Sequence, residues 1–161
     1  MSSIPSTGPV REGGPGADGR STIIVGVDGS EPSLDAVRWA YRQAQLTGAH
    51  LRAVMSWDMP NTAYWVPLPD DMDLQKATEE ALEKALHETL GDNPAVPMTK
   101  VVVKGHPAPV LLQQADDADL LVVASRGHGE FTGMLLGSVS EYCVTHATCP
   151  VVVVRSKPAQ R

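Results

Sequence analysis

The segment from Ala124 to Ser138, ASRGHGEFTGMLLGS, contains the residue types best suited to binding an anion. It holds glycines at positions 127, 129, 133 and 137, and Ser138 opens an expected helix. Glycine lets backbone N–H groups approach an anion closely. A helix N-terminus adds unpaired N–H donors and the positive end of the helix dipole. The segment is therefore a candidate phosphate-binding loop, with the Ser138 hydroxyl as a further ligand; a plain glycine-rich connection is the alternative.

Two common nucleotide motifs do not fit this segment. A Walker A loop is excluded because no Gly-Lys-Ser/Thr sequence follows. The dinucleotide fingerprint does not fit either, since Gly127-x-Gly129 has Thr132 where a third glycine is needed. The segment also follows the fourth apolar run of the chain, whereas that fingerprint follows the first strand of its unit. If this segment binds phosphate, it does so as a loop of another type than these two.

Asp28 is a second candidate, within the sequence Gly26-Val27-Asp28-Gly29-Ser30. Its carboxylate follows the first apolar run and could accept hydrogen bonds from a ribose or hold a metal ion. Capping of the next helix, or shaping of the Asp-Gly turn, is the alternative.

Other polar residues give weaker signals. Arg126 could pair with a phosphate. His106 and His128 could contact a ligand, or could simply be solvent-facing loop residues, and His146 is expected to be structural. No Ser/His/Asp or Cys/His spacing indicates a nucleophile.

Five short apolar runs predict the strands that would position these residues. They are nearly continuous in Val, Ile and Leu, which is typical of strands buried on both faces of a parallel sheet. The runs are 23–27, 51–57, 101–103, 120–124 and 151–154.

Helical spacing fills the gaps between the runs. Apolar residues recur from Leu34 to Ala44, with the helix ending near Gly48. A longer stripe, which includes Leu74, Ala77, Ala81, Leu82, Ala85, Leu86 and Leu90, is expected to begin at Asp73 as cap and to end at Gly91.

Two shorter helices complete the pattern. One carries Val110, Leu111, Leu112 and Ala115, and the last carries Val139, Tyr142, Cys143 and His146 on its apolar stripe. The β-α alternation predicts an α/β fold: an open five-stranded parallel sheet with helices on both faces. Ligands of such sheets bind at the carboxyl ends of the strands, where the strand order reverses.

Composition excludes several classes of protein. The chain has 161 residues, a length for one compact domain, and a formal net charge of −6. Acidic character disfavours nucleic acid and anionic membranes as partners. Aromatic residues are only 4%, too few for a base-stacking platform. With two cysteines and no apolar run long enough for a membrane span or a signal peptide, we expect a cytoplasmic protein.

The expected domain covers residues 21–156. Residues 1–20 contain five Gly, three Pro and three Ser and are predicted to form a flexible tail. Residues 157–161 are predicted to form a second, short tail. The Pro-rich segment 58–73, which contains Tyr64 and Trp65, is expected to be functional or mobile because of its length. The acidic cluster Asp116, Asp117 and Asp119 is interpreted as a solvated turn.

Several of these motifs together resemble the universal stress protein family. They are Ile24–Ser30 (IVGVDGS), the Gly105-His106-Pro107 turn, Ser125-Arg126-Gly127 followed after nine intervening residues by Gly137-Ser138, and Cys149–Val154 (CPVVVV). The resemblance spans residues 21–155. It implies a sheet of order 3-2-1-4-5, usually in a homodimer, and ATP-binding members carry a Gly-x2-Gly-x9-Gly-Ser/Thr motif.

The resemblance also implies roles for particular residues. Gly127, Gly137, Ser138 and the Val139 backbone would hold phosphates, with Mg²⁺ bridging them, and Asp28 would face the ribose. Gly26, Ser56 and Val123 would line the adenine pocket. The full candidate nucleotide-binding set is Gly26, Val27, Asp28, Ser56, Val123, Ala124, Arg126, Gly127, Gly137, Ser138 and Val139.

One position departs from the family motif, because Ala124 stands where the first glycine is expected. If the backbone there requires a positive φ, or a nucleotide packs where the Cβ atom of Ala124 lies, Ala124 weakens binding. Because the other three positions of the motif are intact, the resemblance implies an ATP-binding stress regulator or sensor with little or no hydrolysis. The alternatives are a dimeric interaction module that binds no ATP, a protein that binds AMP or cAMP, and an enzyme that adenylates or phosphorylates a substrate.

The last apolar run, Val151–Val154, is expected at the edge of the sheet. A bare apolar edge strand invites aggregation, so pairing with the same strand of a second copy would protect it. We therefore expect a homodimer formed through this strand.

Overall fold

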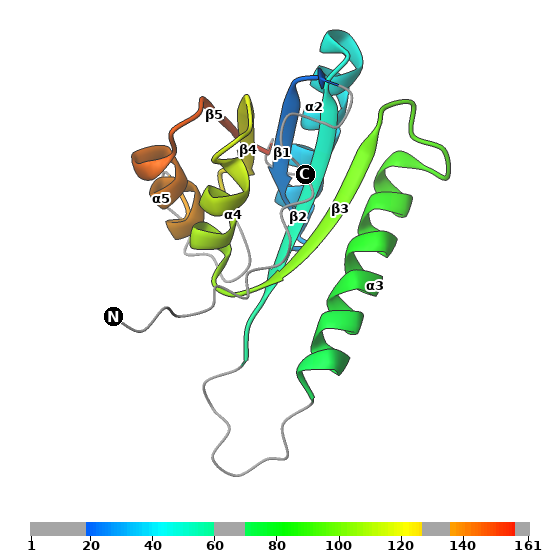
Figure 1. Cartoon of the computed structure of the whole chain (residues 1–161), viewed down its shortest axis with the longest axis vertical. Helices are drawn as coiled ribbons and strands as arrows, with labels where there is room; N and C mark the ends of the chain where they lie inside the picture. The colour runs from blue at the N-terminus through cyan, green and yellow to red at the C-terminus, as the bar shows by residue number, and fades with distance from the viewer. Residues whose placement is uncertain (1–18, 60–69, 127–135, 157–161) are drawn as a thin grey trace, which may run out of the picture.

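A computed structural model describes residues 19–59, 70–126 and 136–156. Within these ranges, strands and helices alternate along the chain (Figure 1). The strands are β1 (Thr22–Gly26), β2 (His50–Trp57), β3 (Met98–Lys104), β4 (Leu120–Ala124) and β5 (Val151–Val154). The helices are α2 (Glu31–Thr47), α3 (Asp71–Leu90), α4 (Pro107–Ala115) and α5 (Ser138–His146).

The five strands form one parallel sheet in the order β3-β2-β1-β4-β5. The central strand β1 pairs with β2 on one side and with β4 on the other, so that Val25 lies opposite both Ala53 and Val122. The predicted fold class and strand order are confirmed. The strand order reverses between β1 and β4, which fixes where the chain changes from one face of the sheet to the other.

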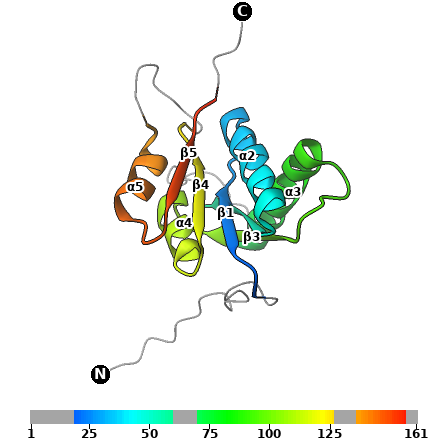
Figure 2. The same ribbon diagram turned by 90° about the horizontal axis from the view of Figure 1, so that it is seen from above.

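Helices α2 and α3 cover one face of the sheet, and α4 and α5 cover the other (Figure 2). Alternate strand residues such as Val25, Leu51 and Val122 pack in a core beneath α2 and α3. The intervening residues, such as Ile24 and Val54, pack with α4 and α5 in a second core. Apart from Met55 and Cys143, the buried residues of both cores are aliphatic, which agrees with the low aromatic content of the sequence.

Helix α3 begins earlier than predicted and is less buried than its apolar stripe suggested. Its N-cap is Asp70, whose carboxylate accepts a hydrogen bond from the Met72 N–H at 3.4 Å, and Asp73 lies inside the first turn. The prediction of Asp73 as the cap was wrong. Asp70 and Asp71 carry the same carboxylate acceptor, so the local sequence does not show which of the three residues caps the helix.

The burial of α3 is confined to its second half. Leu82, Ala85 and Leu86 are buried, whereas Ala77 and Ala81 are exposed. A 20-residue helix is about 30 Å long, whereas the seven-residue strand β3 beneath it spans about 23 Å. The first turns of α3 therefore extend beyond the end of β3 and are left exposed.

The acidic cluster before β4 is not merely a solvated turn. The Asp119 carboxylate accepts a hydrogen bond from the Thr22 N–H at 2.8 Å, which ties the start of β1 to β4. Asp117 lies 3.4 Å from the guanidinium of Arg52, a charged side chain that is almost fully buried beneath α4. The Arg52 guanidinium also donates to the Gln114 carbonyl. Two of the three acids thus join elements at the amino-terminal edge of the sheet.

Helix α5 packs through a narrower stripe than predicted. Cys143 is fully buried, as expected, and burial raises the pKa of its thiol to about 11, with a smaller contribution from Cys149. His146 and Tyr142 were placed on the same apolar stripe, but both are exposed and their rings stack at 4.1 Å. Because α5 contacts the sheet through one side only, these two side chains lie outside the core.

No helix in the three described ranges is long and apolar enough to cross a membrane.

Candidate functional site

The candidate site lies at the carboxyl edge of the sheet, where β1 and β4 end side by side. The chain leaves β1 toward α2 on one face and leaves β4 toward α5 on the opposite face. A crevice between two such connections is the usual ligand position in open α/β sheets. The predicted residues at the ends of β2, β1 and β4 lie along this edge, because these three strands are consecutive in the sheet, and the predicted residues at the start of α5 join them there.

The β1 side of this edge is a tight turn built around Asp28. Val27 continues the sheet by donating its N–H to the Val54 carbonyl at 2.9 Å. The Asp28 carboxylate then accepts hydrogen bonds from the N–H and the hydroxyl of Ser30, while Gly29 adopts a φ of +83°. Asp28 therefore shapes the Asp-Gly turn, and its exposed side chain is held in one orientation at the edge of the sheet.

The β4 side of the edge brings the start of α5 against the end of β4. Ser125 continues the strand by donating its N–H to Val154, and its carbonyl accepts the Gly137 N–H at 2.7 Å. The two ends of the intervening segment are thus joined. This contact places Gly137, Ser138 and Val139 directly beside the end of β4.

The first turn of α5 begins with backbone donors that have no acceptor inside the helix. Its first intrahelical hydrogen bond runs from the Glu141 N–H to the Gly137 carbonyl, and within the described residues no side chain caps the helix. The N–H groups of Ser138, Val139 and Ser140 precede that bond and have no acceptor within the helix. Three donors and the positive end of the helix dipole therefore meet at one point.

The other described helices do not offer this arrangement. Helix α4 has Pro107 and Pro109 in its first turn, and α3 is capped by Asp70 and carries further acids. Helix α2 is capped by the Ser30 hydroxyl and begins with Glu31. Proline lacks an N–H, and a cap or an acid already occupies the donors that an anion would use. Among these four helix starts, an anion is best accommodated at α5.

Ala124 carries no backbone strain. No non-glycine residue in the described ranges has a positive φ, so an alanine is conformationally acceptable at this position. Its methyl group packs against the core beneath α2 and α3, whereas α5 lies on the opposite face of the sheet. The Ala124 side chain therefore points away from the first-turn N–H groups of α5.

Gly26, Ser56 and Val123 occupy the face covered by α4. A Cβ atom on Gly26 would lie 2.9 Å from Cδ1 of Leu111, so this glycine allows α4 to pack closely. Val123 is buried in the core beneath α4 and α5. Ser56 is partly buried and shares a face with Val54, two residues earlier on the same strand. Arg126 is exposed directly after Ser125, at the end of β4.

Sequence reasoning missed a cluster of paired charges at the ends of β2 and β3. The Lys104 ammonium lies 5.3 Å from the centre of the Trp57 ring and 2.7 Å from the Asp71 carboxylate. His106 Nε2 lies 3.5 Å from the Asp58 carboxylate. No local pattern in the sequence signals this cluster, because it depends on the register of β2 and β3, which places Trp57 opposite Lys104. Since each charge has a partner, this cluster fastens α3 and the turn before α4 to the sheet.

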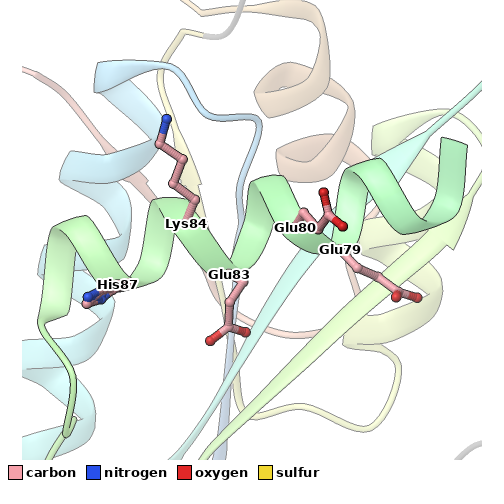
Figure 3. A pocket seen from close by; sticks show the side chains of 5 residues that line it. All are labelled: Glu79, Glu80, Glu83, Lys84 and His87. Carbon is pink, nitrogen blue, oxygen red and sulfur yellow. The ribbon is translucent and has the colours of Figure 1, made fainter. Parts of the chain in front are cut away.

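A shallow depression on the outer surface of α3 lies away from this edge (Figure 3). The side chains that line it all come from one exposed helix: Glu79, Glu80, Glu83, Lys84 and His87. Glu83 is paired with Lys100, Lys84 with Glu88, and His87 with Asp92. No second element encloses a ligand there, so we do not assign a site to this surface.

Several predicted features lie outside the described residues. They are Gly127, His128, Gly129 and Gly133 of the glycine-rich segment, Tyr64 and Trp65 of the segment 58–73, residues 1–18 of the predicted tail 1–20, and the predicted tail 157–161.

The fold and this edge define a class: a doubly wound α/β domain in which α2 and α5 start on opposite faces of the sheet at its switch point. The universal stress protein family model matches residues 19–155. The chain belongs to the universal stress protein family.

Relatives and solved structures agree with this assignment. Universal stress protein Rv2623 of Mycobacterium tuberculosis is 37% identical over 136 residues, covering 84% of this chain and 46% of the relative. Rv2005c of the same organism is 39% identical over 135 residues, covering 83% and 45%. The chain thus spans less than half the length of these curated relatives.

Two solved structures show the same fold at moderate sequence identity. The UspA protein of Lactobacillus plantarum is 26% identical with a TM-score of 0.70, covering 84% of this chain and 98% of that chain. A universal stress protein solved in complex with cAMP is 28% identical with a TM-score of 0.57, covering 86% and 98%.

Proposed function

We propose that this protein binds an adenine nucleotide, ATP in particular, and acts as a stress-response regulator or sensor. The observation that carries the proposal is the start of α5, where three N–H groups without intrahelical acceptors lie beside the end of β4. A family member 28% identical to this chain has been solved in complex with cAMP, which supports an adenine nucleotide as the ligand class.

In this proposal the two sides of the edge bind different parts of the nucleotide. The α5 start, with the Ser138 hydroxyl and Arg126, binds the phosphates. The fixed carboxylate of Asp28 binds the ribose hydroxyls. The adenine lies near the ends of β1, β2 and β4. The assigned residues are those of the candidate set given above, Gly127 included.

A divalent ion fits this site only through the nucleotide. In the described part of the chain, no three His, Cys, Asp or Glu side chains come together as a metal site. The phosphates and water would therefore supply most ligands of Mg²⁺. We assign no catalytic base in this edge, and we accordingly propose little or no hydrolysis.

Titration of ATP into the purified protein, with and without Mg²⁺, tests the proposal. We expect saturable binding, with AMP and cAMP as competitors that report which phosphate groups matter. Gly137→Ala is a useful companion variant because Gly137 has a φ of −69° and an added Cβ meets only ordinary contacts in the protein. It should weaken binding without unfolding the chain. No saturable binding at millimolar nucleotide would overturn the proposal.

A dimeric interaction module that binds no nucleotide is the second candidate. Strand β5 pairs with β4 and lies at the end of the strand order, and its four valines are only partly buried. Pairing with a second copy would cover this apolar edge. We propose a homodimer through β5 in either case, with residues 21–156 as the folded unit in the cytoplasm. Sedimentation that shows only monomer at micromolar concentration would contradict the dimer.

A further inference from the structure

Two buried serines occupy equivalent places on the two sides of the site. Ser33 is the third residue of α2 and Ser140 is the third residue of α5, and their exposed fractions are 3% and 2%. Each helix follows one of the two strands that flank the switch point. Because a buried hydroxyl needs hydrogen-bond partners, their contacts show what each serine does in the structure.

The Ser33 hydroxyl joins both ends of the Asp28 turn. It accepts the Asp28 N–H at 3.3 Å and donates to the Ser30 carbonyl at 2.9 Å. Both hydrogen-bonding functions of this hydroxyl are therefore used. Since the Asp28 N–H donates to the Ser33 hydroxyl, the backbone that carries the carboxylate is fixed relative to the start of α2.

The Ser140 hydroxyl performs the corresponding task on the β4 side. Its oxygen lies 2.9 Å from the Gly137 carbonyl and 3.2 Å from the Ser125 carbonyl, and its single hydrogen is shared between these acceptors. The Ser125 carbonyl also accepts the Gly137 N–H. Ser140 thereby ties the end of β4 to the N-cap of α5 and sets where the first-turn N–H groups of that helix point.

We propose that Ser33 and Ser140 are positioning residues of the nucleotide site. Ser33 fixes the group that binds ribose, and Ser140 fixes the helix start that binds phosphate. This inference rests on the proposed function. Neither serine lies at the surface of the site, so each acts through another residue and not by contact with the ligand.

The inference predicts separate effects on two ratios of affinity. The ratio of ATP to 2′,3′-dideoxy-ATP measures recognition of the ribose hydroxyls, and the ratio of ATP to adenosine measures recognition of the phosphates. Loss of one ordinary hydrogen bond changes an equilibrium by about three- to tenfold. Ser33→Ala should lower the first ratio by that factor, and Ser140→Ala should lower the second, each leaving the other ratio unchanged.

The same helices offer matched control variants. Thr47 on α2 and Thr145 on α5 also donate their hydroxyls to backbone carbonyls, at 2.8 and 2.9 Å, but at the far ends of the helices. Thr47→Ala and Thr145→Ala should leave both ratios unchanged. A loss of stability alone would move both ratios together or neither, so either pattern in the serine variants would overturn the inference.

Amide hydrogen exchange of the ligand-free protein provides a readout that does not require nucleotide. Ser33→Ala should accelerate exchange of the Asp28 amide, and Ser140→Ala should accelerate exchange of the Gly137 amide. Unchanged exchange at both amides would overturn the positioning roles. If the wild-type protein binds no adenine nucleotide, the proposed function fails on that result, whereas the exchange data still decide whether the serines hold these two groups.

Discussion

Helices α4 and α5 begin at the same edge of the sheet and cover the same face, yet their first turns differ in the backbone donors that they keep. In α4, Pro107 and Pro109 remove two of the first three N–H groups. In α5, Ser138, Val139 and Ser140 keep all three, and Gly137 provides no capping side chain. Proline and a capping side chain stabilise a helix start, whereas their absence leaves donors for a ligand. The comparison shows that an anion site is recognised as much by missing features as by present ones.

Placing a carboxylate at the start of α5 should lower the affinity for ATP more than any other change proposed here. At Gly137 the backbone accommodates a side chain, so Gly137→Asp should fold and cap the helix, leaving thermal stability equal or higher. The new charge would repel phosphate, and affinity for ATP should fall by about a hundredfold. Calorimetric titration and thermal unfolding measure the two effects.

The same change at α4 is the control for that experiment. His106 is the N-cap of α4 and is exposed, so His106→Asp adds a carboxylate at the neighbouring helix start. We expect affinity to change by less than about threefold, because an exposed charge farther from the phosphates is screened by solvent. Equal losses in the two variants would show that α5 is not the phosphate site.

Replacing the first residue of α5 by proline, the first residue of α4, should lower the affinity for ATP by a smaller factor. Gly137 is extended, as the residue before a proline must be, and proline is favoured at the first helical position. Ser138→Pro should therefore preserve stability while removing one N–H and one hydroxyl, with a loss of affinity of about tenfold. Ser138→Ala removes only the hydroxyl and should lose about threefold. A proline variant that binds as tightly as the alanine variant would exclude the Ser138 N–H as a ligand.

The buried residues of α4 and α5 should contribute differently to the stability of the protein at alkaline pH. Helix α4 is anchored by Val110 and Leu111, whereas α5 is anchored by Cys143, whose pKa is raised to about 11 by burial. The unfolded thiol ionises near its ordinary pKa of 9.0, so the stability that the neutral thiol contributes is present below pH 9 and is lost as the pH rises to about 11.

Thermal unfolding between pH 8 and 11 measures this effect. The melting temperature of Cys143→Ala should fall less steeply over that interval than that of the wild type. Val110→Ala, a truncation on α4 without a titrating group, should retain the wild-type slope. Parallel slopes for all three proteins would contradict a raised pKa at Cys143.

Restoring the missing glycine at the end of β4 should have the smallest effect on binding. The Ala124 methyl points to the face opposite α5, so Ala124→Gly should change ATP affinity by less than about twofold. It should lower stability by about 0.5–1 kcal/mol, since glycine is more flexible in the unfolded chain and packs less apolar surface. A large gain in affinity would mean that the nucleotide occupies the face covered by α2.

Much of this arrangement was predictable from the sequence. The runs 120–124 and 151–154 coincide with β4 and β5, since continuous aliphatic residues between polar turns leave few other structures. The switch-point edge followed from the β-α order. The cap of α3 and the exposure of Tyr142 and His146 were mispredicted, because several residues shared the same local signal and only packing distinguishes them.

The site was predicted as a set of residues, but its construction was not. Ser33 and Ser140 are ordinary serines in the sequence, and their importance appears only when their hydroxyls are found between a strand end and a helix start. Likewise, the Arg52–Asp117 pair joins residues 65 positions apart. No local pattern signals contacts of that kind.

The sequence alone determined the alternation of strands and helices, the family, and the glycine-rich segment as the candidate anion site, because these depend on local composition and spacing. Tertiary structure decided the rest. It placed the Ala124 methyl on the face away from α5, and it showed that the Asp28 carboxylate is already part of a turn. Those facts depend on which face a side chain occupies and on which distant groups reach it, and only the packed sheet fixes both.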